Sequence, residues 1–299
     1  MELETFNRRS RPQVFRRMAR EPFDILIIGG GITGASIFRD AVLRGMRVAL
    51  IEAKDFASGA SGRSSRLIHG GLRYLKSLNF RMVWEASHER NLHLRINKRL
   101  VQPLPFLIPL YRGKGESRTM MRLGMWIYEA MAGFKNHRFH SFLNREETLS
   151  LSPELPKDGL TGGCLYYDAA VNDNRLTVET IKDGVRNGGL AVNHTQASAL
   201  IKENGKITGA ICRDGTSGST YEIQAGTVVN ATGGFVDGIR KMDRPDVWNF
   251  VELSKGTHLV FDEKDVPLTI TTVFSSPIDG QKLFIARREG CFLLGTSDN

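Results

Sequence analysis

Apolar residues near the start of the chain follow the pattern of a strand, a helix and a second strand. Residues 23–28 form a short, β-branched apolar run, which predicts a buried parallel strand. Residues 32–44 carry apolar side chains at helical spacing, and Gly45 is a typical helix stop. Residues 47–52 predict a second strand. Together they predict a βαβ unit of about 30 residues with a right-handed crossover.

The rest of the chain alternates between helical and extended patterns. The predicted helices are 79–100, 118–133 and 173–186. The predicted strands are 105–111, 190–193, 198–201, 207–211 and 226–231, followed by short strands and turns over 256–296. Prolines at 103, 105 and 109 end the first of these helices. The pattern predicts an α/β fold, in which a parallel nucleotide-binding sheet is interleaved with a mainly antiparallel segment.

Composition places the chain among soluble proteins with a basic surface. Hydrophobic residues make up 41% of the 299 residues, and no apolar run approaches the roughly 20 residues that span a bilayer. The net charge of +9 favours anionic partners, such as lipid headgroups, nucleic acid or phosphorylated substrates. Cys164, Cys212 and Cys291 have no spacing that predicts a metal site or a disulfide framework, which favours free thiols in a reducing cytosol.

The densest basic cluster is at the N-terminus. Its arginines are Arg8, Arg9, Arg11, Arg16, Arg17 and Arg20. Apolar residues lie among them, so residues 1–20 predict either a short amphipathic surface helix or a solvated basic arm. Only Phe6 and Phe15 supply aromatic rings there, too few for a base-stacking platform, so no nucleic-acid partner is predicted.

Glycines after the first strand form the pattern G-x-G-x-x-G at Gly29, Gly31 and Gly34. The first permits the tight turn, the second lets the backbone approach a pyrophosphate, and the third lets helix and strand pack closely. Glu52 ends the second strand and is placed to bond a ribose 2′-hydroxyl, which disfavours a nucleotide with a 2′-phosphate. The fingerprint predicts a dinucleotide site but leaves NAD and FAD both open.

Two further stretches resemble flavoproteins. Residues 228–234, Val-Val-Asn-Ala-Thr-Gly-Gly, are similar to the strand and Ala-Thr-Gly turn of two-dinucleotide-fold flavoproteins. Residues 64–75, Ser-Ser-Arg-Leu-Ile-His-Gly-Gly-Leu-Arg-Tyr-Leu, closely resemble the FAD-dependent glycerol-3-phosphate dehydrogenases of the D-amino-acid-oxidase superfamily. Further segments continue in that register: 80–81, 85–86, 89–90, 105–109, 173–176, 230–237, 255–258 and 294–298.

The resemblance implies a two-dinucleotide-binding, Rossmann-like FAD fold with an interleaved, mainly antiparallel α+β substrate domain. The FAD-binding domain is expected over 21–100 and 174–250, and the substrate domain over 101–173 and 251–299. The implied reaction oxidises sn-glycerol 3-phosphate to dihydroxyacetone phosphate and passes the electrons to a quinone or another acceptor. It further implies a cytoplasmic protein associated peripherally with the inner face of the membrane, and it leaves a homodimer open.

The resemblance also implies roles for individual residues. The expected FAD-contacting residues are Gly29, Gly31, Ile32, Thr33, Gly34, Glu52, Ala53, Ser64, Ser65, Leu67, His69, Gly70, Gly71, Ala197, Ala231, Thr232 and Gly233. Arg73 and Tyr74 are expected to reach into the substrate pocket, where a guanidinium binds or polarises the glycerol phosphate. His258 is the expected acid or base, and Thr296 is expected to contact substrate from a strand end.

Two departures from the family pattern keep alternatives open. Arg287 and Arg288 stand where the family usually has an Ile-Pro-Trp-type stretch, and they either bind phosphate or face water. They motivate a second interpretation, a related FAD-dependent oxidase or dehydrogenase of another hydroxy acid or amine. The family also continues well beyond residue 299, which motivates a third, a fragment that holds FAD weakly and is inactive alone.

Overall fold

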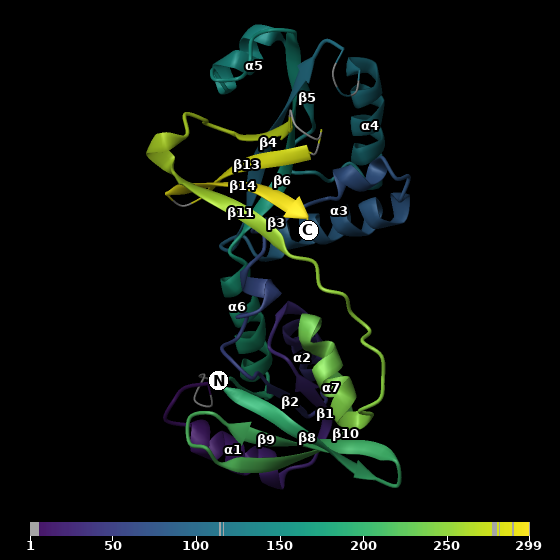
Figure 1. The fold of residues 1–299 in the computed structure, drawn as a ribbon, viewed down its shortest axis with the longest axis vertical. Coiled ribbons are helices and arrows are strands. Elements are labelled where there is room, and N and C mark those ends of the chain that lie inside the picture. The colour runs from purple at the N-terminus through teal and green to yellow at the C-terminus, as the bar shows by residue number, and fades with distance from the viewer. Residues whose placement is uncertain are drawn as a thin grey trace. The chain divides into compact units, whose positions relative to one another are not determined.

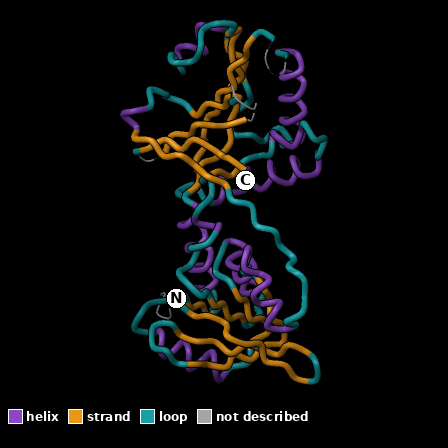
Figure 2. The backbone as a smooth tube through the Cα atoms, viewed as in Figure 1, coloured by secondary structure: helices purple, strands orange, loops and turns teal. Residues whose placement is uncertain are grey.

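The computed structural model describes residues 6–113, 115, 117–276, 280, 282–288 and 290–298, with the last three as backbone only. Figures 1 and 2 show the chain. It folds as two compact units: unit 1 comprises Met1–Ser64 and Asn172–Leu253, and unit 2 comprises Ser65–Val171 and Ser254–Asn299. The chain therefore leaves unit 1 after Ser64, earlier than the predicted change near residue 100, because the segment that follows packs with the strands of unit 2.

Unit 1 is built on a sheet with the strand order β7-β2-β1-β10-β9-β8. Its strands are β1 (Phe23–Ile28), β2 (Val48–Ile51), β7 (Leu190–Val192), β8 (Thr195–Glu203), β9 (Lys206–Asp214) and β10 (Thr220–Asn230). The first four in the spatial order run parallel, and β9 and β8 continue the sheet antiparallel. The predicted parallel nucleotide-binding sheet is confirmed, and Asn204-Gly205 forms the turn of its β8–β9 hairpin.

Helices α2 (Ile32–Leu43) and α6 (Asp173–Arg186) pack together in unit 1. Phe38 of α2 is fully buried, and a Cβ on Gly184 of α6 would overlap its ring, so the glycine permits the close approach of the two helices. A short helix, α7 (Val236–Asp243), follows β10. Because only residues 29–31 separate β1 from α2, the N-terminus of α2 lies at the carboxyl end of β1, where the glycine pattern lies.

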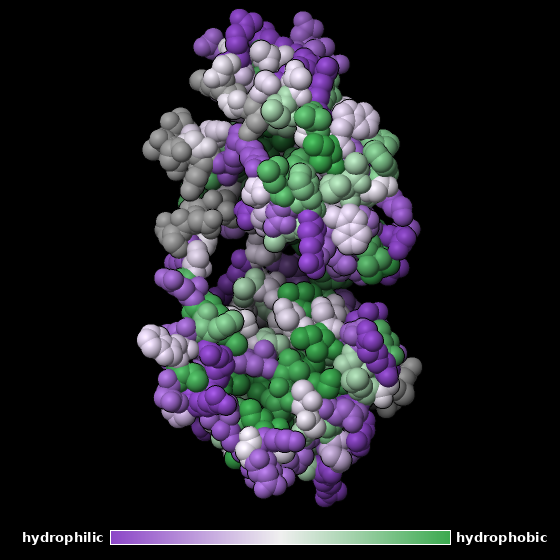
Figure 3. Space-filling view, turned by 90° about the vertical axis from the view of Figure 1, so that its right-hand side faces the viewer, coloured by the Kyte–Doolittle hydropathy of each residue, from purple (hydrophilic) through white to green (hydrophobic). Residues whose placement is uncertain are grey.

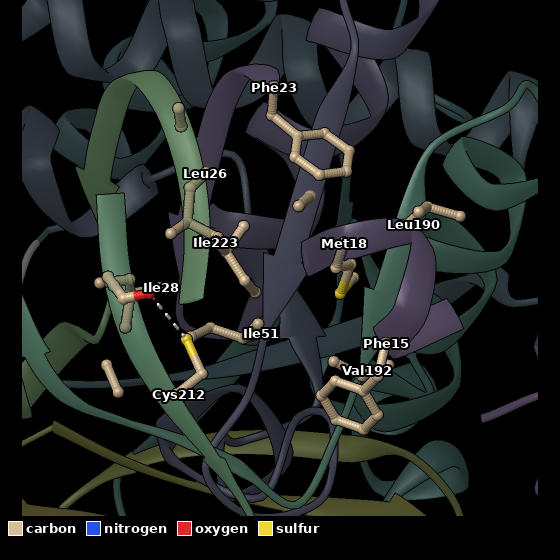
Figure 4. Close-up of a cluster of buried hydrophobic side chains, with 14 of the residues drawn as sticks. Phe15, Met18, Phe23, Leu26, Ile28, Ile51, Leu190, Val192, Cys212 and Ile223 are labelled. Atoms are coloured by element: carbon tan, nitrogen blue, oxygen red, sulfur yellow. Dashed lines mark hydrogen bonds between the residues drawn. The ribbon is translucent and has the colours of Figure 1, made fainter. Parts of the chain in front are cut away.

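The N-terminal helix α1 (Arg11–Arg20) confirms the short amphipathic helix predicted for the basic stretch and contradicts the solvated arm. Val14, Phe15 and Met18 are at most 1% exposed and pack in the core formed with strands β1, β2, β7 and β10 (Figure 4). The ring of Phe15 stacks on Tyr221 of β10 at 4.4 Å between centroids. Residues 11–20 are therefore not a solvated arm, because the apolar face of their helix is covered by unit 1 itself.

Unit 2 is built on a second sheet with the strand order β11-β14-β13-β12-β4-β6-β3, and β5 pairs with β6 at one end. Its strands are β3 (Leu67–Ile68), β4 (Val101–Tyr111), β5 (Ser141–Leu143), β6 (Leu160–Val171), β11 (Gly256–Asp262), β12 (Thr271–Ser275), β13 (Lys282–Arg288) and β14 (Cys291–Asp298). The β12–β4 pair is parallel and the others are antiparallel, which confirms the mainly antiparallel segment.

Three helices accompany this sheet: α3 (Phe80–Ile96), α4 (Arg118–Met131) and α5 (Arg145–Leu151). Buried Val83, Met125 and Tyr128 fix α3 and α4 against β4 and β6. The outer faces of α3 and α4 keep large apolar side chains in solvent, and Figure 3 views this side, where apolar patches interrupt the hydrophilic surface. In the described part of the chain, no helix combines the length and apolar character that a membrane crossing requires.

Candidate functional site

The loop between β1 and α2 is shaped by its glycines. Gly29 has φ +117°, a conformation that L side chains rarely adopt, and a Cβ there would overlap the carbonyl of Ala231. A Cβ on Gly34 would overlap the carbonyl oxygen of Gly29. The site beside Gly31 is more open, since the nearest atom to a Cβ there is the hydroxyl of Ser61 at 3.1 Å. The space beside Gly29 and Gly34 is therefore filled by backbone atoms, and the loop has more room beside Gly31.

Glu52 and Ser61 hold this loop from the side. Glu52 Oε2 accepts the N–H of Gly30 at 2.7 Å, and its Oε1 accepts the N–H of Lys54 at 2.8 Å. The Ser61 hydroxyl accepts the N–H of Ile32, the first residue of α2, at 2.8 Å. A carboxylate has lone pairs to spare beyond these two bonds, so Glu52 can still accept a ribose hydroxyl. The loop fits the pyrophosphate and ribose of a dinucleotide at a helix N-terminus.

The other predicted dinucleotide contacts of unit 1 lie at nearby strand ends. The N–H of Ala231 donates to Ile28 O at 2.8 Å, which places the Ala231–Gly233 turn beside the β1–α2 loop. The Thr232 hydroxyl donates to Asn230 Oδ1 at 2.7 Å. Thr33 and Ala53 are exposed beside this loop, one in the first turn of α2 and the other directly after Glu52. Ala197 is 3% exposed near the start of β8.

Ser64 ends the first part of unit 1. Its hydroxyl donates to Asp173 Oδ2 at 2.6 Å, in the first turn of α6. Ser64 is predicted to bond FAD, but in the structure its hydroxyl is bound to Asp173. In the sequence, Asp173 stands out only as part of a segment that resembles the family. Ser64 and Asp173 together bring the end of the 57–64 loop to the N-terminus of α6.

Gly70, in unit 2, lies on a buried polar cluster. Its N–H donates to Asp168 Oδ1 at 2.8 Å, and its carbonyl accepts the Ser87 hydroxyl at 3.1 Å. Arg90, 1% exposed, donates to both Asp168 Oδ1 and the Tyr128 hydroxyl at 2.6 Å. A Cβ on Gly70 would overlap the Tyr128 hydroxyl. Glycine is required here because of this close approach.

The charges of this cluster compensate one another. Burial opposes the charge of Arg90, but Tyr128 and Asp168 outweigh it and raise the pKa of the guanidinium. Burial, reinforced by Asp168, also raises the pKa of Tyr128, so the phenol stays protonated and donates to Asp168 Oδ1 at 3.1 Å. The cluster is therefore an ion pair with hydrogen bonds to both charges, the condition under which buried charges are tolerated.

The turn that follows carries His69, Arg73 and Tyr74. Gly71 has φ +75° and precedes the 3-10 turn Leu72–Leu75. Arg73 is exposed, stacks over the Tyr74 ring at 4.9 Å and donates to its hydroxyl at 3.2 Å. His69 is also exposed, with its ring centroid 6.1 Å from that of Tyr74. Of the predicted pair of pocket residues, Arg73 thus keeps a solvent-accessible guanidinium with no carboxylate partner among the described residues.

His258 meets the start of this segment. Its Nε2 lies 2.9 Å from the Ser65 hydroxyl, which is separated from it by most of the chain. Arg288 donates to the carbonyl oxygens of Ser65 and Arg66, at 3.1 and 3.5 Å. Burial, with Arg288 contributing, lowers the pKa of His258. His258 is therefore neutral at neutral pH and able to accept a proton.

The two arginines that depart from the family pattern have different partners. Arg287 pairs with Glu263, on the exposed side of β13. Arg288 is half-buried and holds backbone carbonyls, and burial, reinforced by Arg66, lowers its pKa. The sequence pattern predicts that Arg288 either binds phosphate or faces water. Its guanidinium instead donates to the backbone carbonyls of Ser65 and Arg66. Thr296 lies in β14, and its side chain falls outside the described part of the structure.

Unit 1 brings together most of the residues predicted within it, and unit 2 brings Ser65 to His258 and, separately, His69 and Arg73 to Tyr74. Leu67 lies in β3 and pairs with Ala170 of β6. Sequence reasoning missed Ser61, Ser87, Tyr128 and Asp168. No short sequence motif marks these residues, because their partners lie elsewhere in the chain. Only Asp168 could have been noticed, since it is a charged residue inside an otherwise apolar run.

Known proteins resemble this chain over nearly all of its length. A family model described as FAD dependent oxidoreductase matches residues 24–299. The aerobic glycerol-3-phosphate dehydrogenase of Bacillus subtilis is 38% identical over 293 residues, which are 98% of this chain and 53% of that protein. The protein of the same name from Staphylococcus haemolyticus is 38% identical over 299 residues, which are 100% of this chain and 53% of the relative. The chain spans about half the length of these curated relatives.

Solved structures agree with the fold. The glycerol-3-phosphate dehydrogenase from Bacillus halodurans, complexed with FAD, superposes with a TM-score of 0.76 at 33% identity, covering 97% of this chain and 50% of that one. The L-α-glycerophosphate oxidase from Mycoplasma pneumoniae, with FAD bound, gives a TM-score of 0.68 at 18% identity, covering 93% of this chain and 72% of that one. The second likeness concerns the fold alone.

Proposed function

Because the chain belongs to the family of FAD-dependent oxidoreductases, we propose that it binds FAD and oxidises sn-glycerol 3-phosphate to dihydroxyacetone phosphate. The observation that carries this proposal is the meeting of His258 with Ser65, at the start of the segment that leads to Arg73 and Tyr74. His258 is thereby a proton acceptor in the same unit as an exposed guanidinium, and the two groups are suited to take the hydroxyl proton and to bind the phosphate of a phosphorylated alcohol.

The β1–α2 loop is proposed to hold the dinucleotide part of FAD. The pyrophosphate would lie beside Gly31 and the N-terminus of α2, with Ile32, Thr33 and the turn at Ala231–Gly233 around it. Glu52 would accept a ribose hydroxyl, and Ala53 and Ala197 would border the adenine. Ser64, Ser65, Leu67 and His69–Gly71 would serve the flavin side. When bound, FAD supplies the two-electron acceptor for the hydride that leaves C2.

His258 is proposed to take the proton of the C2 hydroxyl. Oxidation of a secondary alcohol removes a hydride from carbon and a proton from oxygen, so that the C–O single bond becomes a carbonyl. The lowered pKa of His258 keeps its imidazole neutral and able to accept that proton. The Ser65 hydroxyl, at 2.9 Å, fixes the orientation of the ring. Arg73, and the side chain of Thr296, are proposed to bind the phosphate and the glycerol hydroxyls.

Flavin bleaching tests the proposal directly. Purified protein should show flavin absorbance, and anaerobic sn-glycerol 3-phosphate should bleach it. His258→Gln should retain the flavin and lower kcat by about 10²- to 10⁴-fold, the usual contribution of a general base. In the wild type kcat/KM should rise with pH through an apparent pKa below that of an ordinary histidine.

Other outcomes would replace the proposal. If another hydroxy acid or an amine bleaches the flavin and glycerol 3-phosphate does not, the related oxidase or dehydrogenase is the correct interpretation. A colourless protein that gains no flavin on reconstitution would show that these residues do not hold the cofactor by themselves, as an inactive fragment would behave.

We further propose that the outer face of α4 docks on an anionic membrane, where a quinone would accept the electrons. Met120, Leu123 and Trp126 are each more than half exposed and recur every three residues along the helix. Arg118 and Arg122 flank them, with guanidinium carbons 5.8 and 5.3 Å from the Phe142 ring. An apolar stripe bordered by arginines is the surface that anionic lipid attracts.

Vesicle binding tests this face. Trp126→Glu should abolish sedimentation with vesicles that contain phosphatidylserine, whereas Trp248→Glu, at a 90% exposed tryptophan of unit 1, should not. Binding that both variants retain would contradict the assignment. A dimer in sedimentation velocity that Trp126→Glu alone dissociates would assign the face to a homodimer instead.

A further inference from the structure

The buried cluster beneath Gly70 holds two consecutive peptide groups of the turn at 69–71. Asp168 accepts the N–H of the His69–Gly70 peptide, and Ser87 donates to the carbonyl of the Gly70–Gly71 peptide. Ser87 lies on α3 and Asp168 on β6, and both are at most 3% exposed. The turn is thus attached at Gly70 both to helix α3 and to strand β6.

Because peptide groups are planar, these two hydrogen bonds fix the orientation of both peptides. In a trans peptide the N–H and the C=O point in opposite directions. With the Gly70 N–H directed at Asp168, the His69 carbonyl points away from the cluster. With the Gly70 carbonyl directed at Ser87, the Gly71 N–H likewise points away from it. The cluster therefore directs one acceptor and one donor to the opposite side of the turn.

Arg90 makes this anchor rigid. It donates to Asp168, to the Tyr128 hydroxyl and to the carbonyl of Tyr167, and its second terminal nitrogen bonds Asn91 and Asn136. Asn136 in turn donates to the buried Glu129 at 2.6 Å. A side chain with so many partners cannot rotate without breaking several of them, so Asp168 has a single position.

We propose that Ser87 and Asp168, fixed by Arg90, are positioning residues that present the His69 carbonyl and the Gly71 N–H to the isoalloxazine of FAD. A flavin carries alternating acceptors and a donor on its polar edge, so a fixed donor and acceptor pair is complementary to it. A turn free to rotate would lose this complementarity, because either peptide could flip. This inference rests on the proposed function only in assigning the 69–71 turn to the flavin.

Two variants of equal chemistry separate positioning from stability. Ser87→Ala and Thr148→Val each delete one buried hydroxyl of unit 2 that donates to a backbone carbonyl, but Thr148, in α5, bonds Asn144 and lies outside the cluster, whereas Ser87 bonds Gly70 directly. Both should lower the melting temperature to a similar extent. Ser87→Ala alone should weaken FAD binding about tenfold and alter the visible circular dichroism of the bound flavin. It should also lower kcat about tenfold, with KM for glycerol 3-phosphate within twofold of the wild type.

The measurements with FAD need no substrate, so they distinguish the possible failures. If the wild type binds FAD and both variants match it, or if both variants weaken binding equally, the positioning role is overturned and the proposed function stands. If the wild type binds FAD but does not oxidise glycerol 3-phosphate, the substrate proposal fails, and the FAD affinities and dichroism of the variants still decide the positioning role. A wild type that binds no FAD overturns both.

Discussion

The two units use different means to shape the turns predicted to contact FAD. In unit 1 the turn at Gly29–Gly34 is made by the backbone, and a few neighbouring residues determine its shape. In unit 2 the turn at 69–71 depends on side chains from α3, α4 and β6, which lie far apart in the sequence. The difference shows that neighbouring residues determine a turn made by the backbone, whereas a turn held by side chains forms only once segments from other parts of the chain have packed against it.

The largest expected effect is that of a methyl group on Gly34. Its Cβ would overlap the Gly29 carbonyl, a backbone atom that β1 holds in place, so Gly34→Ala should destabilise unit 1 by about 4 kcal/mol or more and abolish flavin retention. Gly238→Ala in α7, which meets open space, is the matched control and should be neutral or slightly stabilising. Chemical denaturation measures both, and equal curves would refute the local character of this site.

Breaking the buried ion pair of unit 2 comes next. Arg90→Met leaves Asp168 charged without its partner, and this should cost about 3–5 kcal/mol. Arg81→Met removes an arginine of the same helix from its exposed pair with Glu85, and the free energy of unfolding should not change measurably. Urea denaturation compares the two. Similar losses would show that burial of the Arg90 pair does not set its importance.

The ion pair of Arg11 with Asp214 joins α1 to the sheet of unit 1, and its effect should be smaller. Burial would raise the pKa of Asp214, but bonds from Arg11, Thr216 and Ser217 prevail and lower it to about 2. A lowered carboxyl pKa stabilises the fold above the unfolded value of about 4, and this contribution, on the order of 2 kcal/mol, is lost as the pH falls toward 2.

Asp214→Asn tests this pH dependence. The variant should be less stable at neutral pH, and its free energy of unfolding should vary less between pH 4 and pH 2 than that of the wild type. Acid titration followed by circular dichroism measures the difference. Parallel curves for the two proteins would mean that the Arg11–Asp214 pair does not couple α1 to the sheet.

The smallest effect concerns a local motif within unit 2. Asn144 and Glu147 form a capping box at the start of α5, in which each side chain accepts a backbone N–H from the other residue. Asn144→Ala should cost about 1 kcal/mol, and Asn144→Asp, which keeps the acceptor, should cost less. Thermal denaturation compares them. If Asn144→Ala lowered the free energy of unfolding as much as Arg90→Met, local contacts would matter as much to the stability of unit 2 as contacts between distant segments.

Sequence reasoning recovered the elements whose pattern is local. Helix α6 begins and ends at the predicted residues, and β1, α2 and β2 differ from prediction by at most one residue at an end. Strand β4 begins four residues earlier than predicted because α3 ends at Ile96, where Asn97 closes the helix. In each case, periodicity, glycine or proline determines the structure without help from distant residues.

The elements that escaped prediction depend on distant partners. Strand β6 lies between β4 and β3 and carries Gly162 against Leu143 of β5 and Gly163 against Thr148 of α5, so it shows no simple alternation. Helix α1 was predicted as a short amphipathic helix, but its burial was not, because its partner Tyr221 comes much later in the chain. Asp168 and Tyr128 escaped for the same reason, since each acquires its role only beside Gly70.

The pairing of β1 with β10 has a consequence during synthesis. Phe23 of β1 pairs with Ala225 of β10, so the centre of the unit 1 sheet cannot close until the ribosome has made most of the chain. At the usual rate of translation the interval is roughly 10 to 40 seconds. Throughout it, one edge of an apolar strand lies open on the nascent chain. Production of this protein should therefore depend on chaperones that shield such an edge, and slower growth at low temperature should raise its soluble yield.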